Sequence, residues 1–140
     1  MEEQALAPLV DRNGLEILSR DECLALLGGS GMGRVAVTMN ALPVVLPVCY
    51  AVLDEDVIIR TGTGTKLSAA VNHAVVTFQI DHLDGDERWS VCVTGVASPV
   101  TRPEDLAAVV GLSMPTGLRT LRPHFVRIRS DLVSGRRLLG

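Results

Sequence analysis

Aromatic residues are scarce in this chain, which has one tryptophan, one tyrosine and two phenylalanines among 140 residues. Proteins that bind single-stranded nucleic acids use aromatic side chains as stacking platforms, and few are available here. A surplus of positive charge is also missing, because the formal net charge is -3 and the pI is near 5.5. No overall basic field exists to attract a phosphate backbone. We therefore expect no nucleic-acid partner.

Paired cysteines and long apolar runs are missing as well. The three cysteines, Cys23, Cys49 and Cys92, lie far apart, and their odd number argues against a disulfide framework and for a reducing compartment. The first residues, Met1 to Gln4, are acidic and do not resemble a signal peptide. No apolar stretch is long enough to cross a membrane. We expect a cytoplasmic protein that makes no membrane contact.

What is present is typical of one globular domain over residues 1–140, since 47% of the residues are hydrophobic. Residues 1–17 look like a loose leader. Ser19 and Glu22 then form a capping box, which predicts a short helix with an apolar face. Gly28 is expected to end this helix, because glycine accepts the left-handed conformation there.

Six segments that follow have the alternation or composition of strands. They span residues 31–39, 43–53, 57–61, 74–81, 89–100 and 125–132. Two further short helices are expected at residues 67–71 and 104–110, a loop at 111–122, and a basic tail after residue 134. Gly95, inside the longest strand, suggests a bulge or tight bend. Six short strands in one domain favour a closed or partly closed β-barrel.

The most informative stretch connects a predicted strand to a predicted helix through Thr61-Gly62-Thr63-Gly64-Thr65-Lys66. Glycines allow backbone N–H groups to approach a ligand closely. The start of a helix, a lysine and several hydroxyls together suit a phosphate. Two interpretations stay open at this point, a phosphate-binding loop and a plain strand-to-helix turn with a solvated lysine.

The sequence gives little support for other kinds of binding or catalytic site. The glycine–lysine spacing is too short for a P-loop, and Leu67 stands where the hydroxyl that holds magnesium would be. No βαβ unit surrounds the loop, as a dinucleotide fingerprint requires. The histidines, His73, His82 and His124, lack metal-ligand spacing with the cysteines. We name no catalytic acid or base and no metal ligand.

Several segments of the chain, taken in their order, resemble those of a known protein family. They are the segments 18–23, 33–37, 46–50, 60–67, 89–91 with Gly95, and 123–128. The chain is similar over Leu18 to Arg137 to the pyridoxamine 5'-phosphate oxidase-like flavin-binding proteins, particularly their bacterial nitroimidazole-resistance-type branch. The resemblance implies a mainly β protein with a six-stranded split β-barrel and two or three small peripheral helices. It also implies FMN at the interface of a homodimer.

The resemblance further implies which residues bind the cofactor. Thr61, Thr65 and Lys66 would hold the phosphate, and Pro47, Val48 and Cys49 would run along the flavin ring. The remaining positions that match the family's site are Arg60, Leu67, Trp89 and Ser90. The chain departs from the family at Cys49, where many relatives carry asparagine. The basic pocket that true pyridoxamine phosphate oxidases use for a second phosphate is not evident, although Arg136 and Arg137 could serve.

The leading hypothesis is an FMN-dependent oxidoreductase that passes electrons or hydride to a small acceptor, such as a nitro compound or a quinone. The flavin itself would carry the redox chemistry. One alternative is a flavin or haem carrier or sensor without turnover, with His124 or His73 as a haem ligand. Another is a deazaflavin-dependent reductase, because deazaflavin also has a ribityl phosphate.

Overall fold

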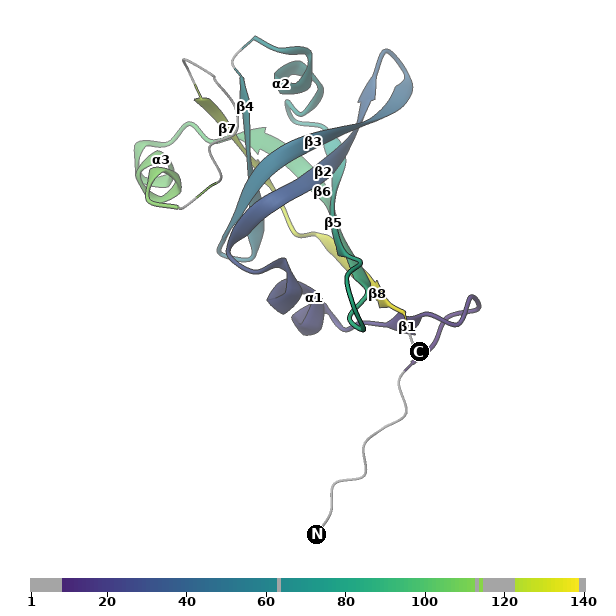
Figure 1. The fold of residues 1–140 in the computed structure, drawn as a ribbon. Coiled ribbons are helices and arrows are strands. Elements are labelled where there is room, and N and C mark those ends of the chain that lie inside the picture. Colours follow the sequence, from purple (N-terminus) through teal and green to yellow (C-terminus); the bar gives the residue numbers. More distant parts are fainter. Residues whose placement is uncertain (1–8, 63, 113, 115–122, 139–140) are drawn as a thin grey trace.

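The computed structural model describes residues 9–62, 64–112, 114 and 123–138 (Figure 1). Eight antiparallel strands and three short helices make up this part of the chain. The strands are β1 (Glu16–Ile17), β2 (Ser30–Met39), β3 (Leu42–Leu53), β4 (Asp56–Gly62), β5 (Val75–His82), β6 (Trp89–Pro99), β7 (Pro123–Ile128) and β8 (Leu132–Arg137). The helices are α1 (Arg20–Leu27), α2 (Lys66–Ala70) and α3 (Pro103–Val110).

Six of the strands close into a barrel, as the sequence predicted. Their order around the ring is β6-β5-β2-β3-β4-β7, and the pairing of β6 with β7 closes it. Every neighbouring pair is antiparallel, and closure leaves few exposed edges. The inward-facing side chains fill the barrel with a single apolar core that includes Val35, Ile59, Phe78 and Ile128.

Strand β6 divides its pairing between two partners. Trp89 to Thr94 pair with β8, whereas Ala97 to Pro99 pair with β7. Gly95 lies where the partners change, and a Cβ atom placed on it would come 1.9 Å from the Arg129 carbonyl oxygen. The backbone between β7 and β8 therefore crosses β6 at a point that only glycine leaves open. This is the close approach that Gly95 suggested.

Helix α1 lies across one end of the barrel, and α2 lies near the other (Figure 1). The predicted capping box is present, since the Ser19 hydroxyl accepts from Glu22 N and the Glu22 carboxylate accepts from Ser19 N. Gly28 ends the helix with a φ of 67°. Cys23 and Leu27 are buried in the barrel core, so this short helix is held mainly by its apolar face.

Helix α3 covers the outer face of β4. Val109 packs there with Ile58 and Val100 in a second, smaller apolar cluster. The predicted loop at residues 111–122 lies mostly outside the described residues. No helix of the described ranges is long and apolar enough to cross a membrane.

The C-terminal segment differs from the prediction. The expected last strand at 125–132 ends earlier, as β7 at Ile128, and most of the basic tail belongs to a further strand, β8, that was not predicted. Gly135 and Ser134 break the apolar alternation that marks a strand, which explains why β8 was not predicted. Arg136 and Arg137 pair with Asp11 and Glu16 at 2.9 and 3.3 Å.

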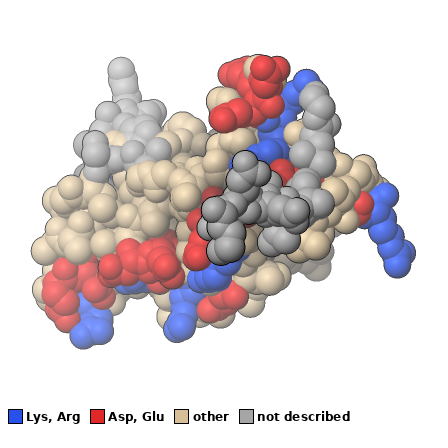
Figure 2. Space-filling view, turned by 90° about the horizontal axis from the view of Figure 1, so that it is seen from below, with Lys and Arg blue, Asp and Glu red and all other residues tan. Residues whose placement is uncertain are grey.

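The expected loose leader is likewise ordered in the part that the structure describes. Ile17 N donates to Leu9 O at 2.7 Å, and Glu16 lies opposite Arg137 in the β1–β8 pair. From below, acidic and basic side chains alternate over this end of the molecule (Figure 2). The positive charge of the tail is therefore matched locally.

Candidate functional site

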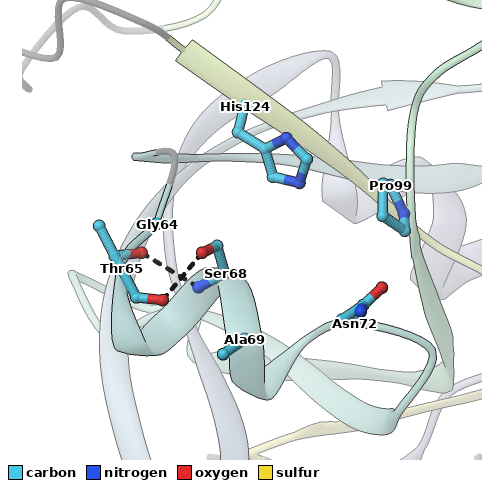
Figure 3. Close-up of a pocket in the computed structure, with 7 residues that line it drawn as sticks. All are labelled: Gly64, Thr65, Ser68, Ala69, Asn72, Pro99 and His124. Atoms are coloured by element: carbon cyan, nitrogen blue, oxygen red, sulfur yellow. Dashed lines mark hydrogen bonds between the residues drawn. The ribbon is translucent and has the colours of Figure 1, made fainter.

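The loop after β4 begins the candidate site, because it sets the direction of α2. Thr65 is the N-cap of α2, and its hydroxyl oxygen accepts from Ser68 N at 3.1 Å (Figure 3). The same hydroxyl donates to Gly62 O at 3.0 Å. The Thr61 hydroxyl, which is buried, faces His124 O at 3.4 Å. Both threonines that were predicted to contact phosphate thus use their hydroxyl hydrogens within the fold.

Lys66 is the group in this loop that stays available. It is the first residue of α2, is exposed, and is the only lysine in the chain. It forms no ion pair with another residue of the described ranges. Leu67, the next residue, is partly buried and packs against the barrel core. A flexible ammonium beside a strand-to-helix turn is well suited to an anion.

A pocket of about 580 Å³ separates α2 from the β2–β3 hairpin, and we call it the hairpin pocket. Lys66, Ala69 and Ala70 form its wall on α2. The opposite wall comes from the hairpin and consists of Thr38, Met39, Asn40, Leu42 and Val44. The pocket therefore combines apolar side chains on both walls with two polar residues, Thr38 and Asn40, on the hairpin and one cation, Lys66, on α2.

A second pocket, of about 340 Å³, lies on the other side of α2, and we call it the helix pocket (Figure 3). Its lining consists of Gly64, Thr65, Ser68, Ala69, Asn72, Pro99 and His124. Thr65 and Lys66 are neighbours in sequence, yet they line different pockets. Ala69 lines both pockets, and the joint contact of Thr61, Thr65 and Lys66 with one phosphate stays a prediction.

The predicted ring contacts lie on β3, where they alternate between the two faces of the barrel wall. Val48 is buried in the core, whereas Pro47 and Cys49 face outward. Cys49 is buried as well, with its Sγ atom 3.2 Å from Met32 Sδ. From Leu42 to Cys49 the described structure pairs β3 with β2 alone, because the β4 pairing begins at Tyr50. Pro47 therefore occupies a local edge, as a proline in a strand requires.

A row of polar side chains connects Pro47 to Ser90 across the outer face. Arg34 lies opposite Pro47, and its guanidinium donates to Gln79 Oε1 at 3.0 Å and to Asp81 Oδ2 at 3.5 Å. Gln79 in turn donates to Ser90 Oγ at 2.9 Å. We call Arg34, Gln79, Asp81 and Ser90 the polar row. A small hollow of about 210 Å³ adjoins it, beside Met32 and Pro47.

Sequence reasoning missed Arg34, Gln79 and Asp81 as site candidates. Strand alternation alone places Arg34 on the outward face of β2. The pairing of β2 with both β3 and β5, which brings Arg34 between Pro47 and Gln79, has no signal in a single sequence.

Arg60 and Trp89, the remaining predicted contacts, lie apart from both pockets. Arg60 is on the outer face of β4 opposite Phe125. Its Nε atom is buried and has no hydrogen-bond partner in the part of the chain that is described. Trp89 is partly buried against the core, and its ring stacks on His82 with centroids 5.9 Å apart. The unpaired guanidinium N–H of Arg60 is therefore a buried donor outside both pockets.

The thiols show no sign of nucleophilic activation. Burial raises the pKa of Cys23 and of Cys92 above the ordinary value, so both stay protonated at neutral pH. Among the residues described, no three His, Cys, Asp or Glu side chains cluster closely enough to hold a metal ion.

The closed six-stranded antiparallel barrel with three small helices is the split β-barrel fold that the sequence predicted. The chain belongs to the pyridoxamine 5'-phosphate oxidase family, whose pattern matches residues 19–137. An uncharacterised protein of Mycobacterium tuberculosis is 38% identical over 129 residues, which are 87% of this chain and 84% of that protein.

Two solved structures agree with this assignment. An FAD-binding protein from Mycobacterium smegmatis is 33% identical, with a TM-score of 0.78 over 89% of this chain and 98% of its own. A putative pyridoxamine 5'-phosphate oxidase from Corynebacterium glutamicum is 30% identical, with a TM-score of 0.80 over 90% of this chain and 99% of its own.

Proposed function

We propose that this protein is a flavin-dependent oxidoreductase that binds the phosphate of its flavin at Lys66. The observation that carries the proposal is the position of this residue, the only lysine of the chain, exposed at the first turn of α2 and at the mouth of the hairpin pocket. A charge-assisted contact from an ammonium to a phosphate is among the stronger polar interactions in proteins. Membership of the pyridoxamine 5'-phosphate oxidase family supports a phosphorylated ligand.

The family resemblance of the sequence implied FMN, whereas the M. smegmatis relative is described as binding FAD. Both carry a phosphate next to the ribityl chain, so Lys66 suits either. When bound, the flavin would supply the transfer of electrons or hydride to a small acceptor. The protein's own part is to bind and orient it. The open edge of β3 at Pro47 to Cys49 presents backbone donors and acceptors that can meet the polar edge of a flat ring.

We also propose that two copies of the chain form the working protein. The outer face around the polar row carries exposed apolar side chains on five strands. These are Met32, Val45, Val75, Val96 and Leu132, with exposed fractions between 38% and 67%. Several exposed apolar side chains on one face of a small barrel are typical of an interaction site.

The test of the phosphate contact is Lys66→Ala, with Lys66→Arg as the charge-conserving variant. We expect FMN and FAD affinity to fall about 10- to 100-fold in Lys66→Ala, because a hydrogen bond to a charged group contributes about 1.5–3 kcal/mol. Lys66→Arg should recover most of the loss. Flavin fluorescence quenching measures both values.

Arg129→Ala is the matched control, since Arg129 is an exposed cation on the connection between β7 and β8. It should leave flavin affinity within twofold. The lone lysine allows a second measurement, because an amine-acylating reagent can modify no other side-chain amine. Bound flavin should slow acylation of Lys66, as followed by mass spectrometry. Unchanged affinity and unchanged acylation would remove Lys66 from the site.

Turnover separates an oxidoreductase from a flavin carrier. Purified protein with flavin, a nicotinamide donor and a nitro compound or quinone should consume the donor steadily. Protein that takes up flavin tightly but gives no consumption with any such acceptor would be a carrier or sensor.

A further inference from the structure

The β2–β3 hairpin leaves an apolar surface without a partner at the α2 end of the barrel. Val37 pairs with Val44, and Met39 pairs with Leu42, so these four side chains share the inward face of the hairpin. Val37 is buried in the core, but Leu42 is 65% exposed. The hairpin extends past the strands beside it, and its tip stands next to α2 (Figure 1). The inward face thus continues beyond the core and becomes one wall of the hairpin pocket.

The opposite wall leaves room for a flat group. Ala69 and Ala70 have the smallest side chains that a helix can present there, and a volume of about 580 Å³ remains between the walls. Ligand pockets in proteins commonly measure about 300–1,000 Å³. The turn is tight and fixed, because Asn40 and Ala41 both have positive φ, of 51° and 65°. The hairpin wall of the pocket is therefore held by a tight turn.

The charge and polarity of the residues that line the hairpin pocket indicate which kind of ligand it can bind. Lys66 is the one charged residue that lines the pocket, which calls for an anionic group at that side. Met39, Leu42 and Val44 suit the face of an aromatic ring, and the Asn40 amide can pair with the donor and acceptor edge of a purine. A ligand with a phosphate beside Lys66 and a purine between the hairpin and α2 meets all of these features.

We propose that the hairpin pocket binds the adenosine half of a dinucleotide flavin, with the pyrophosphate at Lys66. This inference rests on the proposed function, which places the flavin phosphate at Lys66, and it makes FAD the preferred flavin. The flavin ring then extends from Lys66 away from the pocket, and the adenine lies against Leu42. FMN fills none of the hairpin pocket beyond its phosphate.

The experiment compares FMN and FAD affinity in the full chain and in two serine variants. Leu42→Ser removes an apolar wall of the pocket without adding charge. Leu83→Ser is the control, because Leu83 is 63% exposed and lies just after β5, outside the pocket. Both leucines are exposed, so both variants should keep the fold, which circular dichroism verifies.

We expect the unmodified chain to bind FAD at least tenfold more tightly than FMN. Leu42→Ser should weaken FAD binding roughly tenfold, because most of a leucine side chain is then no longer covered by the ligand. FMN binding should stay within twofold, and Leu83→Ser should change neither value. Equal affinity for the two flavins, or equal losses in Leu42→Ser, would overturn the adenosine site and leave a flavin-binding protein. A chain that binds neither flavin would overturn the proposed function itself.

Discussion

Tyr50 joins the helix at one end of the barrel to the barrel wall. Its ring is buried beside Phe78, with centroids 4.7 Å apart, and its hydroxyl donates to the Leu27 carbonyl oxygen at the end of α1. The last carbonyl groups of a helix have no partner within the helix. Tyr50 therefore satisfies a buried acceptor that would otherwise be unpaired.

We predict that Tyr50→Phe destabilises the protein by about 1–3 kcal/mol, because the Leu27 carbonyl loses its donor while staying buried. The ring remains, so packing against Phe78 is kept. Urea denaturation at neutral pH measures the change. A loss below 0.5 kcal/mol, by order of magnitude, would mean that water reaches the carbonyl.

The stability of the wild type and of Tyr50→Phe can also be compared as the pH is raised. Burial raises the pKa of Tyr50, so the folded chain holds the phenol proton more tightly than the unfolded chain does. The contribution of the hydroxyl is therefore complete below the unfolded value of about 10 and is lost as the pH rises through the folded pKa. The stability difference between wild type and Tyr50→Phe should shrink above pH 10. A constant difference up to pH 11 would contradict the burial argument.

Single residues show how far sequence reasoning reaches at this scale. The capping role of Ser19 was predictable, because its partner Glu22 is local in sequence. Thr65 was predicted to donate to phosphate, but in the structure it caps α2. Serine, threonine and their hydroxyls serve both roles at a helix start, and only the conformation of the loop distinguishes them.

Strand β6 is the element on which the split architecture depends. Its first half pairs with β8 and its second half with β7, and Gly95 marks the division. Sequence analysis flagged this glycine but not its cause, since the contact comes from Arg129, 34 positions further along the chain. A close approach between distant segments has no local signature.

Gly95→Ala should destabilise the protein by about 3 kcal/mol or more, or prevent folding. The added methyl group would meet a backbone oxygen at 1.9 Å, and backbone cannot move aside as a flexible side chain can. Thermal denaturation and soluble yield measure the effect. Gly29→Ala is the control, because nothing lies within 4 Å of its Cβ position. Similar losses of stability in both variants would show that the glycine-to-alanine change itself, and not the backbone crossing at Gly95, causes the destabilisation.

Strand β8, in contrast, is an element that was not predicted from the sequence. Its alternation is weak because Ser134 and Gly135 stand where larger apolar residues would mark a strand. A Cβ atom on Gly135 would lie 2.6 Å from Cys23 Sγ, so the small residue is what lets α1 pack against the sheet. The feature that hid the strand from sequence analysis is required by its tertiary contact.

At the scale of the whole molecule, the order of pieces along the chain was enough to predict the barrel and its family. The arrangement of the site was not. The predicted contacts divide among the end of the barrel, its outer face and its interior, as Lys66, Pro47 and Val48 illustrate. We propose that a second copy of the chain covers the outer face, as described above.

We predict that the chain is a dimer and that Val75→Asp makes it monomeric. Val75 is 67% exposed on the outer face, and a carboxylate buried in an apolar contact without a partner is strongly unfavourable. Light scattering at micromolar concentration should give the mass of two chains for the wild type and of one for the variant. Val110→Asp, on α3 and 72% exposed, should stay dimeric. If the partner completes the flavin site, the Val75→Asp monomer should also bind flavin at least tenfold more weakly. A monomer with unchanged flavin affinity would show that the whole site lies within one chain.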